Sequence, residues 1–541
     1  MKDITHAEII EYFKDNPRSQ VIDTKSAKII PANMSRWLEG LFEFYTIEEF
    51  DKLLIYDQES GAYINHAESR IKKILEEYFK DAINSYLVTE TIQHIKRIST
   101  QPFKNLDRYD NLINFKNGVY NIDTQEFLNH DEDYKFSYCL PFEYNKDAKC
   151  DKILTFLASL TSKNEDFITL LEGLAYIFVP KYPIRKAFML VGEGRNGKST
   201  FLSLIEKMLG RDLVSFEKLD VLCRDANYIS NIAGKFANTG FDLPKRGLPD
   251  VANFKSLTTY DYVAGHKKYV QEAFEFQSRA KLFFATNQIP QVDEDTDAFF
   301  SRWIIIKFEK QFEDNPKILE QISSNEELAG LFNLLIPIIK KLQEAYKFTF
   351  AEGIEKTRTT YLKSASPIKL FAEDMLEIGD GEAKSIIYSA YTDYCKKYNL
   401  TAKNEVWFWK ELKHYIQFNV IQEGKEKVRF AKGITLKNND DEQEDTKQEK
   451  MPDIADFNAY CEILGEVGDI IKGYLIVLKN NEITQEIKKE QEPGPKEIKI
   501  NEKVYCPKCA KPVSALYETG YGLICVDCLN TAQRSIDDLT F

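Results

Sequence analysis

Hydrophobic residues in the first part of the chain follow two kinds of spacing. Residues Ala67–Ala82 carry apolar side chains three or four positions apart, which is the period of an amphipathic helix. These side chains are Ile71, Ile74, Leu75 and Tyr78. Between Leu112 and Asn129, two strand-like runs flank the turn Lys116-Asn117-Gly118, which predicts a β-hairpin.

The middle of the chain has the pattern of a mixed sheet. A helical stretch, Ile153–Val179, leads into the apolar run Ala187–Val191, which predicts a buried strand. From there to about Phe308, short apolar runs alternate with helical patterns, which is typical of an α/β sheet. Residues 318–350 are expected to be helical.

The last part of the chain divides into smaller pieces. Residues 366–436 contain helices followed by two strand-like runs, Phe418–Gln422 and Val428–Leu436, which suit a winged helix or a generic small α+β unit. Residues Lys437–Asp453 have no core-forming residue before Met451 and predict a disordered linker. An apolar patch, Ile454–Leu478, and a second linker, Gln485–Glu497, precede a cysteine-containing segment.

Length and composition set the class of protein. A chain of 541 residues is too long for one hydrophobic core, so about three or four folded units are expected. No apolar run has the length of a membrane span and the first residues lack the apolar stretch of a signal peptide, so we expect a cytoplasmic protein with no membrane contact. The net charge of −13 includes acidic segments such as Asp440–Glu444, and a global charge does not exclude a local nucleic-acid groove.

A phosphate-binding loop follows the strand predicted at Ala187–Val191. Residues Gly192 to Ser199 match the pattern G-x-x-x-x-G-K-[ST], and the helical sequence after Thr200 supplies the required strand–loop–helix context. The pattern places Lys198 on the β- and γ-phosphates of ATP and the Ser199 hydroxyl on Mg²⁺. The nucleotide-binding residues predicted in this way are Gly192, Glu193, Gly194, Arg195, Asn196, Gly197, Lys198, Ser199 and Thr200.

Three further polar residues follow or precede strand-like runs. Asp242 lies in the segment Gly234–Pro244 and is a candidate Mg²⁺ ligand, with a solvated turn aspartate as the alternative. Asn287 follows the strand Lys281–Ala285 and could orient a water or sense the γ-phosphate, although such residues also simply end strands. Arg302 precedes the strand Trp303–Lys307 and could reach a neighbouring subunit's nucleotide or pair with a surface acid.

The order and spacing of these segments resemble the superfamily III helicases, in the branch of phage/plasmid primases and poxvirus helicase–primases. The resemblance covers about Asn111 to Leu436, and its matching segments are NFKNGVYNIDT, GEGRNGKST, GKFANTGFDLP, FKSLTTYDYVAGHKKYV, KLFFATNQIP and FFSRWIIIKF. It implies an AAA+-type core that works as a ring, usually a hexamer, with ATP between subunits.

The resemblance also gives roles to individual residues. It implies that Lys198, Asp242, Asn287 and Arg302 are catalytic, with Arg302 as the finger that reaches into the adjacent subunit. It places His266, Lys267 and Lys268 at the tip of a channel hairpin that grips single-stranded DNA, and lysines there suit backbone phosphates. Without the family, these three residues would be an ordinary solvated turn.

Two departures from the family pattern limit what it implies. Relatives often carry paired acids in the second motif, whereas Gly240 and Phe241 precede a single Asp242 here, so the residue that activates water is not identified. Many relatives also carry an N-terminal primase. Residues 1–110 show no pair of acids arranged for two-metal nucleotidyl transfer, which argues against primase activity in this chain.

Four of the nine cysteines form a metal-ligand pattern near the end of the chain. Cys506, Cys509, Cys525 and Cys528 have the spacing C-x₂-C-x₁₅-C-x₂-C, which predicts a structural Zn²⁺ site in a zinc ribbon. An iron site of the same geometry or a redox pair are the alternatives. The other five cysteines are scattered singly, as expected of reduced thiols.

The sequence therefore predicts an α/β protein of six segments. These are an N-terminal α+β region of unassigned role (1–110), a pre-ATPase region with a helical collar (111–180), an AAA+-type ATPase core (181–350), a winged-helix-like unit (351–436), an acidic linker with an apolar patch (437–500) and a zinc ribbon (501–541).

The predicted function is an ATP-dependent replicative DNA helicase of a mobile element, virus or plasmid. It would use ATP, Mg²⁺ and Zn²⁺, form a homo-oligomeric ring, and act on single-stranded DNA or a replication fork, with a separate primase or replication protein as a candidate partner. The alternatives are a motor that moves another substrate and an initiator or loader that uses ATP only to assemble. The single Asp242 keeps the last of these open.

Overall fold

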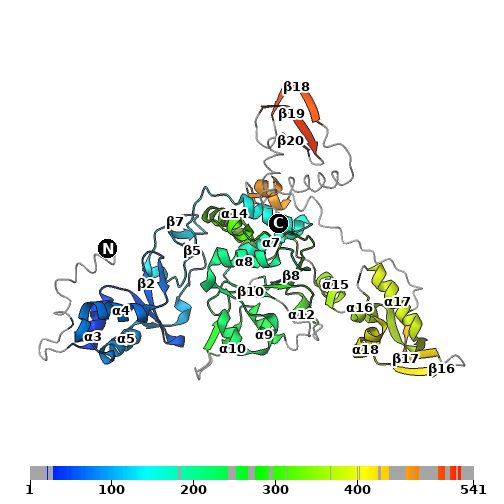
Figure 1. Ribbon diagram of the computed structural model, residues 1–541, viewed down its shortest axis with the longest axis horizontal. Coiled ribbons are helices and arrows are strands. Elements are labelled where there is room, and N and C mark those ends of the chain that lie inside the picture. Colours follow the sequence, from blue (N-terminus) through cyan, green and yellow to red (C-terminus); the bar gives the residue numbers. More distant parts are fainter. Residues whose placement is uncertain are drawn as a thin grey trace. The chain divides into compact units, whose positions relative to one another are not determined.

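The chain forms two compact units, Met1–Ala148 with Met208–Asp212, and Lys149–Lys207 with Leu213–Phe541 (Figure 1). The computed structural model describes residue 21 and residues 29–180, 184–241, 251–265, 274–290, 296–313, 315–351, 353–365, 367–398, 400, 402–423, 428–437, 459–462, 464–465, 467–473, 497–505, 512–519 and 522–524. The fold is of the α/β class, as the sequence predicts.

The first unit contains a four-stranded sheet in the order β3-β2-β1-β4 and a three-stranded sheet in the order β5-β6-β7. Its helices and strands are α3 (Pro31–Glu39), β1 (Phe44–Ile47), β2 (Lys52–Asp57), β3 (Ala62–Ile64), α4 (Ala67–Phe79), α5 (Ser85–Ser99), β4 (Thr100–Gln101), β5 (Leu112–Phe115), β6 (Gly118–Asn121) and β7 (Phe127–Leu128).

Two sequence predictions in this unit are confirmed. The amphipathic helix runs over Ala67–Phe79 and continues as a 3₁₀ turn, Lys80–Ala82, with Ile71, Ile74 and Leu75 buried. These residues pack with Trp37, whose ring meets that of Phe79 edge to face at 5.5 Å between centroids. The predicted hairpin is the antiparallel pair β5–β6.

In the second unit, the helical stretch predicted at Ile153–Val179 is two helices, α6 (Asp151–Leu160) and α7 (Asn164–Tyr176). The break lies at residues 161–163, where the chain turns out of the helical conformation. Glu327 accepts hydrogen bonds from the backbone N–H groups of Lys152 and Ile153, so a carboxylate from a distant helix satisfies the first turn of α6. Burial raises the pKa of this Glu327 carboxyl group.

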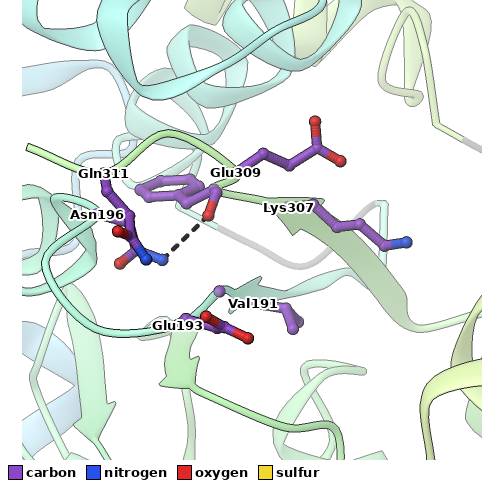
Figure 2. Close-up of a pocket in the computed structure, with 8 residues that line it drawn as sticks. Val191, Glu193, Asn196, Lys307, Glu309 and Gln311 are labelled. Atoms are coloured by element: carbon purple, nitrogen blue, oxygen red, sulfur yellow. Dashed lines mark hydrogen bonds between the residues drawn. The ribbon is translucent and has the colours of Figure 1, made fainter. Parts of the chain in front are cut away.

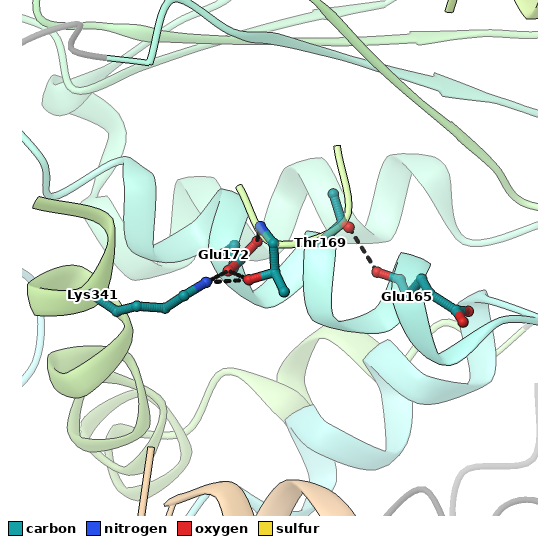
Figure 3. Close-up of polar contacts among 5 residues, drawn as sticks. Glu165, Thr169, Glu172 and Lys341 are labelled. Carbon is teal, nitrogen blue, oxygen red and sulfur yellow. Dashed lines mark hydrogen bonds and ion pairs between the residues drawn. The ribbon is translucent and has the colours of Figure 1, made fainter. Parts of the chain in front are cut away.

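A buried ion pair ties α7 to α14 (Asn325–Ala345) (Figure 3). The Glu172 carboxylate has no exposed surface and lies 2.5 Å from the Lys341 Nζ. It also accepts hydrogen bonds from the backbone N–H of Thr349 at 3.0 Å and from its hydroxyl at 2.6 Å. A buried charge with this many partners holds the ends of the two helices in one arrangement, because breaking it would leave an unpaired charge.

The centre of the second unit is a five-stranded parallel sheet in the order β14-β8-β13-β10-β9. In Figure 1, α7, α8 and α14 lie above this sheet and α9 and α10 lie below it. Its strands and the elements between them are β8 (Ala187–Val191), α8 (Lys198–Leu209), β9 (Val214–Ser215), α9 (Leu219–Arg224), α10 (Ala226–Ile229), β10 (Ala237–Phe241), α11 (Ala252–Leu257), β11 (Tyr262–Gly265), β12 (Phe274–Gln277), β13 (Lys281–Thr286), α12 (Asp297–Phe300) and β14 (Trp303–Lys307).

The strands predicted at Ala187–Val191, Lys281–Ala285 and Trp303–Lys307 are confirmed as β8, β13 and β14. All six residues of β13 are buried, as expected for a central strand of a parallel sheet with both faces covered. Stacked rings, Phe188 on Phe283 at 4.7 Å between centroids, join β8 to β13.

The helical prediction for residues 318–350 is confirmed over α13 (Ile318–Ile322) and α14, which ends at Ala345, whereas residues 346–350 are not helical. Helix α15 (Ile354–Ala365) follows. The next unit contains α16 (Pro367–Met375), β15 (Leu376–Ala383), α17 (Lys384–Lys397), α18 (Glu405–Tyr415), β16 (Asn419–Glu423) and β17 (Val428–Leu436). Its strands form an antiparallel sheet in the order β15-β17-β16.

The two strand-like runs predicted in this unit are confirmed as β16 and β17, but β15 was not expected. Its sequence, LEIGDGEA, has two glycines and three acids and no apolar alternation, so nothing local favours a strand. Its pairing with β17, with a register shift between Gly379 and Glu382, holds it in the sheet.

Two pieces of the C-terminal region are described. In residues 459–473, Tyr460, Cys461, Leu464 and Ile471 are buried, and the Tyr460 ring lies 4.5 Å from the Lys341 Nζ. Farther along, β18 (Glu497–Tyr505), β19 (Pro512–Thr519) and β20 (Gly522–Ile524) form an antiparallel sheet. Within the described ranges, no helix is long and apolar enough to cross a membrane.

Candidate nucleotide-binding site

The candidate loop lies between a central strand and a helix. Strand β8 ends at Val191, the residues Gly192–Gly197 form the loop, and α8 begins at Lys198. Gly197 has a φ of 81°, and a Cβ there would lie 2.3 Å from a methyl carbon of Leu160. Only glycine fits this position, which turns the chain into the helix and leaves backbone N–H groups at the helix N-terminus.

Lys198 points back into the loop. Its ammonium donates hydrogen bonds to the carbonyl oxygens of Gly192 at 2.6 Å and Glu193 at 2.8 Å, and to the Asn196 Oδ1 at 2.7 Å. The side chain is buried, with 7% of its surface exposed. The loop therefore holds the cation at its own centre, where a phosphate wrapped by the backbone N–H groups would meet it.

Asn196 joins the loop to another strand. Its side chain is 3% exposed and donates from Nδ2 to the carbonyl oxygen of Phe308 at 3.0 Å, while its Oδ1 accepts from Lys198 (Figure 2). Gly192 makes room for this crossing, since a Cβ there would lie 2.0 Å from the Asn196 Nδ2. One amide thus connects the phosphate-loop lysine to the end of β14.

A pocket of about 280 Å³ opens beside the loop, on the side of β14 (Figure 2). It is lined by Val191, Gly192, Glu193, Asn196, Lys307, Phe308, Glu309 and Gln311. The pocket wall therefore combines the first half of the loop with the residues that end β14. Three of the lining side chains are charged, so it suits a polar ligand.

The parallel sheet brings the next candidate, Asn287, to the same edge as the loop. Thr286, the last residue of β13, pairs with Val191 of β8, and its carbonyl oxygen accepts from the Gly192 N–H at 3.2 Å. Asn287 follows directly and is exposed. The Thr286 hydroxyl donates to the Gln288 carbonyl at 2.6 Å, which closes a tight turn around Asn287.

Asp242 follows Phe241, the last residue of β10, and lies outside the described residues. Phe241 pairs with Ala285 of β13, so β10 ends at this edge as well. Ser199 is exposed in the first turn of α8, and Thr200 is partly buried beside it.

Arg302 lies at the edge of the sheet where the amino ends of the strands meet, opposite to the edge that carries the loop. It precedes Trp303, which pairs with the first residue of β8, Ala187, and its carbonyl oxygen accepts from the Ala187 N–H at 2.7 Å. The guanidinium donates from Nε to the Thr258 Oγ1 at 2.9 Å and from Nη1 to the Ala298 carbonyl. Five residues of strand, roughly 16 Å, separate Arg302 from Lys307 at the loop edge, so the side chain cannot reach the loop of its own chain.

Parts of the chain are similar to known families and proteins. The family described as "D5 N terminal like" matches residues 35–162, and a family of unknown function (DUF5906) matches residues 190–302, which include the loop, Asn287 and Arg302. The protein named "Putative helicase L207/L206" of Acanthamoeba polyphaga mimivirus is 22% identical over 429 residues. These matches fit the phage and viral helicase–primase family.

The mimivirus match covers 71% of this chain and 44% of that protein, so the chain spans less than half the length of this curated relative. Two solved structures of the NrS-1 C-terminal region are also similar. The A-form apo structure has a TM-score of 0.41 at 11% identity and covers 74% of this chain and 99% of that one. An A-form apo structure of its residues 305–718 has a TM-score of 0.37 at 14% identity, with the same coverage.

Several residues that the sequence predictions name lie outside the described residues. These are Asp242, the hairpin residues His266, Lys267 and Lys268, and the cysteines Cys506, Cys509, Cys525 and Cys528. Among the residues that the structure does describe, no group of three or more His, Cys, Asp or Glu side chains is placed to hold a metal ion. The five remaining cysteines form no disulfide.

Two contacts that shape the site could not be predicted from the sequence pattern. The Phe308 carbonyl, which holds Asn196, lies 112 residues farther along the chain. Thr258, which holds Arg302, is 44 residues before it. Asn196 was expected only to line the phosphate, and its Asn-Gly-Lys sequence does not reveal the second partner.

Proposed function

We propose that the chain is the ATP-driven motor of a replicative DNA helicase, with ATP bound by the Gly192–Ser199 loop. The observation that carries the proposal is the placement of polar groups on the parallel sheet. Lys198 and Asn287 share the carboxyl edge with the end of β10, and Arg302 lies at the other edge. In the strand order β14-β8-β13-β10-β9, the Asn287 strand separates the loop strand from the strand before Asp242.

The proposed chemistry assigns a part to each residue. Lys198 neutralises charge on the β- and γ-phosphates, and the Ser199 hydroxyl with Asp242 holds Mg²⁺. Asn287 orients the attacking water or contacts the γ-phosphate. Arg302 completes the site of a neighbouring copy, which makes the working form an AAA+-type ring.

The DNA contact is proposed for the segment between β11 and β12. These strands pair as an antiparallel ribbon, and Gly265 and Phe274 are the last pair before residues 266–273. A ribbon that ends in His266-Lys267-Lys268 would present two lysines to backbone phosphates of single-stranded DNA.

The test is ATP turnover by the full chain, with and without single-stranded DNA. We expect turnover that DNA stimulates, loss by orders of magnitude in Lys198→Ala, and normal turnover in the control Lys207→Ala, an exposed lysine in the last turn of α8. In Lys267→Ala/Lys268→Ala, basal turnover should persist and DNA stimulation should fall.

Two outcomes would point to the alternatives. ATP binding without turnover in the wild-type chain would favour an initiator that uses ATP only to assemble. Turnover that single-stranded DNA leaves unchanged would favour a motor with a different substrate.

A structural Zn²⁺ ion is proposed for the C-terminal sheet. Strands β18 and β20 end at Tyr505 and Ile524, directly before Cys506 and Cys525, and both run antiparallel to β19 toward its first residue. Four thiolates leave no open position on the metal, so its role would be structural.

Elemental analysis of the reduced, purified chain should find about one Zn²⁺ per chain. Cys506→Ser/Cys509→Ser should release it while ATP turnover persists, because half of the ligand set is gone. Cys139→Ser is the matched control for loss of a thiol, since Cys139 is outside the pattern. Metal-free wild-type protein would contradict the site.

A further inference from the structure

Helices α17 and α18 lie beside the strands β16 and β17 (Figure 1), and lysines and aromatic rings from these elements contact one another. The Lys384 Nζ lies 4.5 Å from the centroid of the Trp409 ring, and the Lys413 Nζ lies 5.9 Å from that of Phe418. The two rings are themselves 5.5 Å apart. Two cations from different helices therefore flank one aromatic pair, at distances that suit cation–π contact.

A third cation, Arg429 of β17, also affects the pKa of Lys384. Burial lowers the pKa of Lys384, Glu405 opposes this change, and Arg429 and Lys413 lower the pKa further. Lys384 is therefore affected by the charges of two other cations, Arg429 and Lys413, and of one carboxylate, Glu405. Like charges repel, and an anion bound beside these cations would reduce the repulsion.

The outward side of α18 continues this surface. At 100° per residue, Val406, Trp407, Lys410, Lys413 and His414 share one side of the helix, and all five are exposed. Trp407 has 55% of its surface exposed, and the Lys410 Nζ lies 5.3 Å from its ring centroid. Glu411 lies at the margin of this side and accepts a hydrogen bond from the Tyr415 hydroxyl at 3.3 Å, while Glu405, the first residue of the helix, lies outside this side.

We call Lys384, Lys410, Lys413, Arg429 and Trp407 the basic face. It stands out in a chain of net charge −13. We propose that the basic face binds duplex DNA, with α18 at the major groove and the flanking cations on the phosphate backbones. This inference rests on the proposed function in taking DNA as the ligand, and adds a duplex contact to the single-strand contact of the motor.

The geometry favours duplex DNA over a protein partner. A helix with its side chains is about 10–12 Å across and the major groove is about 12 Å wide, so α18 can enter the groove. Lys384 and Arg429 stand on separate elements beside the helix, as contacts to the flanking phosphates require. The cores of protein interfaces are poor in lysine, whereas lysine is the main exposed residue here.

The test measures binding of the full chain to a labelled blunt-ended DNA duplex over a series of salt concentrations. The variant is Lys410→Gln/Lys413→Gln/Arg429→Gln, and the matched control is Lys396→Gln/Lys397→Gln at the far end of α17. We expect the slope of log affinity against log salt to fall by about 2 to 3 in the variant and to stay unchanged in the control, because each lost phosphate contact removes about 0.9. Circular dichroism and melting of both proteins check that they are folded.

Trp407→Ala gives an independent measurement. It should weaken duplex binding about 3- to 10-fold without changing the salt slope, because the ring carries no charge and meets bases or sugars.

An equal slope in the folded triple variant and the control would overturn the inference. A slope change seen with single-stranded DNA but not with duplex would also overturn it. The two proposals fail separately: a chain without ATP turnover whose duplex binding depends on the basic face would contradict the motor alone. DNA-stimulated turnover with an unaltered duplex slope would contradict the basic face alone.

Discussion

The two edges of the five-stranded sheet differ in how their charged groups are held. At the carboxyl edge, Lys198 is buried and donates hydrogen bonds to Gly192, Glu193 and Asn196 of the loop. At the amino edge, Arg302 is partly exposed. Its side chain donates hydrogen bonds to Thr258, which directly follows α11, and to Ala298 of α12. A second partly buried cation there, Lys186, donates to the Ser301 carbonyl at 2.6 Å, and desolvation lowers its pKa.

From this difference we expect the two edges of the sheet to serve different subunits: the carboxyl edge would bind a nucleotide and the amino edge would contact the nucleotide of a neighbouring copy. The carboxyl edge has the features of a binding site, because its cation is fixed where a phosphate would lie. At the amino edge the partly exposed Arg302 lies about the length of β14 from the loop of its own chain. A parallel sheet keeps the two edges apart by the length of its strands, so both can serve one nucleotide only when the amino edge of one copy meets the carboxyl edge of another.

The largest expected effect comes from removing the cation of the amino edge. Arg302→Ala should still bind ATP, since Lys198 and Ser199 are intact, but should hydrolyse it about 10³- to 10⁵-fold more slowly, which is the usual effect of an arginine finger. Mixing this protein with inactive Lys198→Ala should restore part of the activity, because some interfaces then combine an intact loop with an intact finger.

The measurement is ATP turnover against the ratio and total concentration of the two variants, with mixed assembly confirmed independently. No recovery of ATP turnover at any ratio would show that Arg302 does not act on the nucleotide of a neighbouring subunit. The amino edge would then not contribute to the site at the carboxyl edge of another copy.

A smaller effect is expected from Asn196→Ala at the carboxyl edge. The variant loses the hydrogen bonds to Lys198 and to the Phe308 carbonyl, and hydrogen bonds to charged groups contribute roughly 1.5–3 kcal/mol, so kcat/KM should fall about 10- to 100-fold. The control is Asn231→Ala, an exposed asparagine far along the chain from the loop. Unchanged kinetics in Asn196→Ala would mean that the loop positions its lysine without help from β14.

The smallest effect is expected from Thr258→Val at the amino edge. Valine keeps the shape of threonine but cannot accept the hydrogen bond from the Arg302 Nε, which costs about 1 kcal/mol of positioning, or about fivefold in turnover. ATP affinity should stay the same, because the loop is untouched. Thr259→Val, one residue on, is the control, and an equal loss of turnover in both would assign the effect to the end of α11 rather than to Arg302.

The local elements around the site could be predicted because their signals are local. The run AFMLV, the glycines and the Lys-Ser pair lie within thirteen consecutive residues, Ala187–Ser199, and they form the strand, loop and helix start that the sequence predicts. The strands at Lys281 and Trp303 are equally apolar and equally clear. By contrast, β15 has no such pattern and depends on its partner β17 for its conformation.

The amino-acid sequence by itself determined the residues of the phosphate loop, the strands that precede Asn287 and follow Arg302, and the amphipathic helix at Ala67. Only the tertiary structure decided the order in which the strands lie, and with it the edge to which each polar residue belongs. It also decided that Asn196 contacts Phe308 and that Thr258 contacts Arg302. The reason is physical: periodicity and loop patterns act over a few residues, whereas sheet order and side-chain partners depend on packing between segments distant in sequence.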